Sequence, residues 1–162
     1  MQIGVPREIK KDEYRVAVTP AGAHELAQHG HDVVVETGAG VASSFSDEEY
    51  LRAGPRIVDA DAAWAAELVC KVKEPQASEF GYLADCGALF TYLHLAAYPD
   101  VAEALCSQAT TSIAYETVQT DDGELPLLAP MSEVAGRMAT QVGAHHLEKA
   151  HGGRGVLLGG VP

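Results

Sequence analysis

Short apolar runs alternate with segments of helical character along most of this chain. The runs have the length of buried strands, and we expect strands at 2–5, 32–36, 57–58, 68–73, 88–93 and 112–118. The segments between them are expected to be helices, at 20–29, 46–54, 61–67, 78–83 and 99–107. Strands separated by single helices imply right-handed crossovers, so the predicted fold class is α/β, a mostly parallel open sheet flanked by helices and Rossmann-like.

Two helix starts have clear sequence signals. Thr19 is a good N-cap, and Pro20 then occupies the first helical position, where a missing N–H costs nothing. Ser46 and Glu49 have the spacing of a capping box at the start of the next helix. Glycines at positions 30 and 54 then end these two helices.

The pattern changes between Pro126 and Pro130. A longer helix is expected from about Ser132, its N-cap, to Lys149, followed by a strand at 156–158 that runs into glycines. A strand entering a glycine-rich turn is how a dinucleotide-binding unit begins. We therefore expect a domain at 1–128, and at 129–162 a linking helix and the start of a dinucleotide-binding domain.

The charge of the chain argues against polyanionic partners. Its 162 residues carry a formal net charge of −12 with only 11 basic side chains, which disfavours nucleic acid and anionic membranes. No apolar run approaches the roughly 20 residues that span a bilayer. Met1 leads directly into a short strand pattern, so no signal peptide is visible.

The cysteines indicate reduced thiols. Cys70, Cys86 and Cys106 are odd in number and widely spaced, and two of them lie in or beside apolar runs. Buried, reduced thiols favour a cytoplasmic location. Without a CxxC or CxxxC pair, the sequence predicts no metal site.

Three residues could form a site for an anionic substrate. Lys73 and His94 close two predicted strands, and Arg15 lies in the charged loop after the first strand. Ligands of open α/β sheets bind beyond the carboxyl ends of the strands, where arginine and lysine can hold a carboxylate and an imidazole can move a proton. Taken singly, His94 also fits a core histidine, and Lys71 and Lys73, on one face of their strand, fit solvated lysines at an edge. Together the three residues favour a carboxylate-binding enzyme.

Five motifs carry a resemblance to a known family. They are Gly4-Val5-Pro6-Arg7-Glu8, Glu13-Tyr14-Arg15-Val16-Ala17-Val18-Thr19-Pro20, Glu36-Thr37-Gly38-Ala39-Gly40, Lys73-Glu74-Pro75 and Tyr92-Leu93-His94-Leu95-Ala96. In this combination and order the chain resembles the NAD-dependent L-alanine dehydrogenases. The resemblance implies that Arg15 and Lys73 bind the substrate carboxylate and that His94 is the proton donor and acceptor. The segment 130–136 resembles the cofactor-contacting stretch, which would place Met131 beside the substrate and Ser132 on the nucleotide.

The resemblance also implies an activity and its partners. L-alanine, NAD and water would give pyruvate, ammonia and NADH, and members of the family form homo-oligomers, typically hexamers. The family is about twice as long as this chain, so we expect residues 1–162 alone to be inactive and to lack a complete NAD site. Two other interpretations stay open: the soluble subunit of a nicotinamide nucleotide transhydrogenase, and a truncated, non-enzymatic interaction module.

Overall fold

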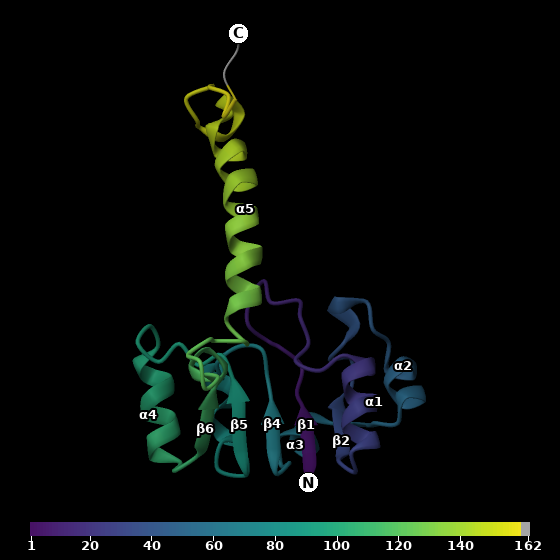
Figure 1. Cartoon of the computed structure of the whole chain (residues 1–162). Coiled ribbons are helices and arrows are strands. Elements are labelled where there is room, and N and C mark those ends of the chain that lie inside the picture. The colour runs from purple at the N-terminus through teal and green to yellow at the C-terminus, as the bar shows by residue number, and fades with distance from the viewer. Residues whose placement is uncertain (160–162) are drawn as a thin grey trace. The chain divides into compact units, whose positions relative to one another are not determined.

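The computed structural model describes residues 1–159, which form two units. The first unit runs from Met1 to Thr117 and holds the sheet with its flanking helices, and the second begins at Val118. Figure 1 shows the strands of the first unit side by side, with their arrowheads at one edge of the sheet. Every described strand pair is parallel, so the predicted α/β class with an open parallel sheet is confirmed.

The strand order of the sheet is β3-β2-β1-β4-β5-β6. The strands are β1 (Gln2–Val5), β2 (Asp32–Glu36), β3 (Arg56–Val58), β4 (Leu68–Cys70), β5 (Ala88–Thr91) and β6 (Thr111–Ala114). The chain winds outward from β1 in one direction through β3, and then in the other from β4 through β6. The loops that leave β1 and β4 diverge at this reversal, which is where open α/β sheets form their ligand crevice.

Helices and short 3₁₀ turns connect the strands. They are α1 (Pro20–Gln28), α2 (Asp47–Ala53), α3 (Ala60–Trp64), α4 (Pro99–Ser107), and the 3₁₀ turns η1 (Val41–Ser43), η2 (Ala77–Tyr82) and η3 (Tyr115–Thr117). The predicted caps of α1 and α2 are confirmed. The Thr19 hydroxyl accepts the Gly22 N–H at 3.2 Å, and Ser46 and Glu49 form a reciprocal capping box.

Alternate residues of the strands supply two separate core layers, because successive side chains of a strand point to opposite faces. One layer combines Ile3 and Val33 of the sheet with Tyr50 of α2. The other combines Val69 and Leu89 with residues of α3, η2 and α4, of which the largest is Trp64. Gly4 permits the close packing of α3 on β1, since a Cβ at this position would lie 1.9 Å from the Ala63 carbonyl oxygen.

Three strands are shorter than predicted. β4 ends at Cys70 rather than residue 73, β5 ends at Thr91 rather than residue 93, and β6 stops at Ala114, before η3. Beyond Cys70 the regular pairing of β4 ends, although the Lys71 N–H still donates to the Phe90 carbonyl at 3.1 Å. The Val72 N–H, which would continue the ladder, instead donates at 2.6 Å to the carboxylate of Glu8. Lys73 and His94 therefore lie in loops beyond the sheet edge and not within strands.

Two other predicted elements differ in the same unit. α3 ends at Trp64 rather than at residue 67, because Ala65 begins the turn that leads into β4. The predicted helix at 78–83 is instead a six-residue 3₁₀ turn, η2, within the longer connection between β4 and β5.

The second unit is built on one long helix, α5 (Ala129–Leu147), followed by the 3₁₀ turn η4 (Lys149–His151). The predicted start at Ser132 is wrong: Pro130 already fits the first helical turn, and the Ser132 hydroxyl donates to the Leu128 carbonyl at 3.3 Å. The predicted end at Lys149 is also late.

The segment 156–158 does not form the predicted strand, since within the described part of this unit it pairs with no neighbour. The expected continuation of the glycine-rich turn at 160–162 lies outside the described residues. Across residues 1–159 no helix is both long and apolar enough to cross a membrane.

Candidate active site

His94 lies just beyond β5 in a constrained backbone conformation. Its φ of 48° is in the left-handed region, which non-glycine residues rarely adopt. Its backbone N–H donates to the carboxylate of Glu116 at 2.7 Å, and its ring stacks on Tyr92 with 5.9 Å between ring centroids. The side chain is 41% exposed. The alternative of a core histidine is therefore wrong, because the imidazole is open to solvent and to a ligand.

Arg15 is held by its neighbour Glu13 in the loop after β1. The Glu13 carboxylate accepts from Arg15 Nε at 2.8 Å and from a terminal guanidinium nitrogen at 2.7 Å. Burial raises the pKa of Glu13, but the hydrogen bonds and charge of Arg15 outweigh burial, so this pKa lies below its ordinary value. The pair is fixed as an ion pair whose guanidinium is 45% exposed.

Lys73 lies close enough to Glu13 to contribute to the lowering of its pKa, after the larger effects of burial and of Arg15. Tyr92 contributes to raising the pKa of Arg15, after the larger effects of Glu13 and of burial. The Arg15–Glu13 ion pair, Lys73 and the stacked rings of Tyr92 and His94 all lie beyond the carboxyl ends of their strands. These residues come from the loops after three different strands, β1, β4 and β5.

A cleft of about 270 Å³ opens beside Arg15. It lies beyond the carboxyl ends of β1 and β2, and its size suits a molecule of a few non-hydrogen atoms. Its lining residues are Arg7, Glu8, Glu13, Arg15, Gly38, Ala39, Val41 and Ala42. Two arginines give this cleft the groups that bind a carboxylate bidentately.

Lys71 is the basic residue whose role the sequence did not reveal. Its side chain has no exposed surface, and its ammonium lies 2.9 Å from Glu79 and 3.3 Å from Glu8. It also faces the ring of Trp64 at 5.6 Å. The expectation of a solvated edge lysine is wrong, because β4 is an inner strand of the sheet. Burial raises the pKa of Glu8, although Lys71 opposes the shift.

A second ion pair joins the loops after β1 and β4. The ammonium group of Lys10 binds the Glu74 carboxylate, which is 2% exposed, and donates to the Tyr98 hydroxyl at 3.1 Å. The Gln76 side chain also donates to Glu74 at 3.3 Å. These contacts fix the ends of the loop that carries Arg15 relative to the loop that carries Lys73.

Met131 and Ser132 lie in the first turns of α5, in the second unit, and both are exposed. Ser132 Oγ is bonded within its own helix, to the Leu128 carbonyl. Their assignments to substrate and nucleotide stay predictions.

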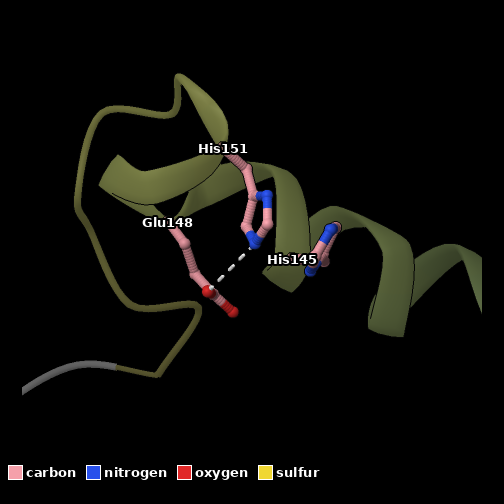
Figure 2. A group of neighbouring side chains, drawn as sticks. All are labelled: His145, Glu148 and His151. Carbon is pink, nitrogen blue, oxygen red and sulfur yellow. Dashed lines mark ion pairs between the residues drawn. The ribbon is translucent and has the colours of Figure 1, made fainter.

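A cluster that the sequence analysis did not identify lies at the end of α5 (Figure 2). His145, Glu148 and His151 each offer one ligand atom, and these atoms lie within 4.8 Å of one another. Two imidazoles and a carboxylate suit Zn²⁺ and similar ions. All three side chains are exposed, and they come from one short stretch of chain, so we assign the cluster no function.

Comparison with known proteins gives one consistent family. The family model described as "Alanine dehydrogenase/PNT, N-terminal domain" matches residues 4–135. The alanine dehydrogenase of Mycolicibacterium smegmatis is 57% identical over the whole of this chain and 44% of its own length, and that of Geobacillus stearothermophilus is 58% identical with the same coverage. This chain therefore spans less than half the length of these curated relatives.

The solved structures agree with the sequence comparisons. An L-alanine dehydrogenase superposes with a TM-score of 0.90 at 50% identity, over all of this chain and 45% of that one. A transhydrogenase from Sinorhizobium meliloti superposes with a TM-score of 0.67 at 29% identity, over 72% of this chain and 35% of that one. The dehydrogenase is the better match in fold, identity and coverage. The chain belongs to the alanine dehydrogenase/PNT family, and it contains the N-terminal domain of that family.

Proposed function

We propose that this chain is the substrate-binding half of an L-alanine dehydrogenase, which converts L-alanine, NAD and water to pyruvate, ammonia and NADH. The observation that carries the proposal is the placement of Arg15, Lys73 and His94 in the loops that follow three neighbouring parallel strands, β1, β4 and β5. The identity of 57% to alanine dehydrogenases along the full chain supports it.

Arg15 and Lys73 bind the alanine carboxylate in this proposal. Glu13 holds the guanidinium in place, so that the entropic cost of ordering a long side chain is met before substrate arrives. Two cations on one carboxylate also orient the α-carbon. That orientation brings the α-hydrogen to a fixed position, which is a large part of what a binding site contributes to rate.

His94 moves the protons. The ammonium group of alanine first loses a proton to solvent. NAD would supply the acceptor for the α-hydrogen, which would leave as hydride, so that the amine becomes an iminium. Water then adds to the iminium carbon, and the imidazole takes the proton that the water loses. The imidazolium returns this proton to the amine nitrogen, and the carbon–nitrogen bond breaks. The hydroxyl proton passes to the imidazole as the carbonyl of pyruvate forms and ammonia leaves.

The residues of this chain fit one part of an NAD site. Ser132 is exposed in the first turns of α5, where a hydroxyl and a helix N-terminus suit an anionic group. No further helix follows the glycines at 152–159 within the described residues. NAD binding and the domain roles of 1–128 and 129–162 therefore belong to the proposal, as do a homo-oligomer and a cytoplasmic location, which the buried thiols of Cys70 and Cys86 favour.

A chimera tests the proposed function. Residues 1–162 are fused to the C-terminal remainder of the Mycolicibacterium smegmatis alanine dehydrogenase, and alanine-dependent formation of NADH is measured. We expect activity that His94→Gly removes. A folded chimera that reduces no NAD with alanine would contradict the proposal. Hydride exchange between nicotinamide nucleotides without alanine would favour a transhydrogenase, and a chimera with neither activity would favour an interaction module.

A further inference from the structure

One carboxylate organises the backbone on which His94 sits. Glu116 lies in η3, just beyond β6, and both of its oxygens face the end of β5. They accept the Leu93 N–H at 3.2 and 3.3 Å, and one of them accepts the His94 N–H at 2.7 Å. Charge-assisted hydrogen bonds of this kind are about twice as strong as neutral ones.

These hydrogen bonds explain how a histidine adopts a left-handed backbone here. The N–H of His94, whose φ is 48°, and the N–H of Leu93 both donate to this single anion. Successive backbone N–H groups that point inward in this way bind anions well. Without the carboxylate, the two backbone N–H groups would have no acceptor. The left-handed backbone of His94 would then be less well fixed, and so would the position of its imidazole.

The same carboxylate faces the imidazole. Its Oε1 lies 4.0 Å from His94 Nδ1, which is too long for a hydrogen bond but close enough for an ion pair when the imidazole is protonated. Tyr92, another titratable side chain, is stacked on the ring. A nearby carboxylate favours the tautomer with the proton on Nδ1, because that N–H points toward negative charge. The other nitrogen, Nε2, is then the one with a lone pair.

We infer that Glu116 is the positioning residue of His94: it holds the left-handed backbone, selects the tautomer protonated on Nδ1, and so presents Nε2 to the substrate. It also stabilises the imidazolium that forms each time His94 takes a proton. The inference rests on the proposed function, because it assigns a partner to the proton-transfer group of that reaction. Glu116 itself touches no substrate.

The first experiment compares turnover in the chimera. Glu116→Gln keeps an oxygen that accepts one backbone N–H but removes the charge, and Glu116→Ala removes both. We expect kcat to fall by about 10- to 100-fold in the alanine variant and by less in the glutamine variant. The KM for L-alanine should change less than about threefold, since the carboxylate-binding residues are untouched.

Glu67→Gln is the matched control. Glu67 also accepts a backbone N–H, that of Gln2, but it lies at the opposite edge of the sheet, at the start of β4. Its replacement should leave kcat unchanged. If kcat fell as much in Glu67→Gln as in Glu116→Gln, the effect of Glu116 would reflect a general loss of stability, and the inference would be overturned.

The second experiment needs no activity. In ¹⁵N-labelled residues 1–162, the chemical shifts of the two imidazole nitrogens report the tautomer of neutral His94. We expect the proton on Nδ1 in the unaltered chain and a shift toward Nε2 in Glu116→Gln. The His94 amide should also exchange with solvent faster in the variant, because its carboxylate acceptor is gone.

The two proposals fail in different ways. If the chimera is inactive but Glu116→Gln still changes the tautomer of His94, the proposed reaction is contradicted and the role of Glu116 is supported. If the chimera is active and both Glu116 variants leave kcat and the tautomer of His94 unchanged, the role of Glu116 is contradicted and the proposed reaction is supported. If Glu116→Ala does not fold, the glutamine variant decides alone, because it is nearly isosteric.

Discussion

The ammonium of Lys71 donates a hydrogen bond of 2.9 Å to the carboxylate of Glu79, and both side chains are almost completely buried. The second oxygen of Glu79 accepts the Gln76 N–H at 2.7 Å. One carboxylate therefore fixes both a core lysine and the first turn of η2. This relationship connects the end of β4 to the segment that follows it, whereas the side chain of Lys73, two residues further on, is only partly buried.

Removal of Lys71 should destabilise the protein. Lys71→Ala leaves Glu8 and Glu79 buried without their cation, which costs about 3–5 kcal/mol of unfolding free energy. Urea unfolding of residues 1–162 measures the change. Lys73→Ala is the control and should cost about 1 kcal/mol or less, since its side chain is only partly buried. Equal losses from the two variants would contradict the assignment of Lys71 to the core.

Removal of the His94 imidazole should act on turnover. His94→Gly is the sharpest variant, because glycine adopts the left-handed backbone without strain and the fold is kept. In the chimera we expect kcat for alanine oxidation to fall by about 10²- to 10⁴-fold. Steady-state kinetics beside a thermal unfolding curve separates loss of chemistry from loss of fold. Normal turnover in this variant would show that His94 carries no proton.

The basic residues of the site should act on binding. Arg15→Lys keeps the charge but loses the planar fork, and Lys73→Ala loses a cation. Each should raise the KM for L-alanine by about tenfold or more while kcat changes less, although misplaced substrate lowers kcat as well. Lys11→Ala, an exposed lysine of the same loop as Arg15, is the control. A KM in either site variant equal to that of the control would remove the residue from the site.

The three cysteines should differ in reactivity. Burial raises the pKa of Cys70 to about 11 and that of Cys86 to about 11, whereas Cys106 is exposed. Near neutral pH, iodoacetamide should therefore modify Cys106 alone in the native protein, and all three thiols after denaturation. Mass spectrometry of the peptides reads this directly. Rapid native labelling of Cys70 would mean that the sheet core opens locally.

Residues 1–162 expressed alone should bind no NAD and should self-associate. The exposed side chains of Val134, Met138 and Val142 recur every fourth residue along α5, which makes an apolar stripe. Isothermal titration with NAD and sedimentation at several protein concentrations test the two expectations. Stoichiometric NAD binding would contradict the incomplete site, and Val142→Glu should shift the polypeptide toward the monomer if the stripe mediates association.

Signals from neighbouring residues in the sequence predicted most of the fold. The N-caps at Thr19 and Ser46 and the α/β alternation depend on neighbouring residues, and these predictions are confirmed. The positions at which the strands end depend on residues that are distant in the sequence. Just beyond β4, the Val72 N–H donates to the carboxylate of Glu8, 64 residues away, and no window of sequence contains that contact. The start of α5 was missed because Ser132 was preferred as a cap over Pro130 as a first-turn residue.

The site was predicted to a similar extent, and for the same reason. Arg15, Lys73 and His94 could be proposed because each follows an apolar run, and the family motifs point to the same residues. Glu116 could not, because it follows a different strand and acts through backbone N–H groups that a sequence does not display. Lys71 was misjudged because its place on an inner strand follows from the strand order alone.

The central place of β1 also gives the protein an order of assembly. During synthesis the half of the sheet formed by β1, β2 and β3 leaves the ribosome first and can pair through contacts about 30 residues apart. The other half joins it only when Leu68 reaches its partner Ile3. Arg15 is therefore synthesised with this half-sheet before the strands that precede Lys73 and His94 exist. Until β4 pairs with β1, the apolar strand β1 is an exposed edge with one side unpaired, and this interval is when the nascent chain most needs protection from aggregation.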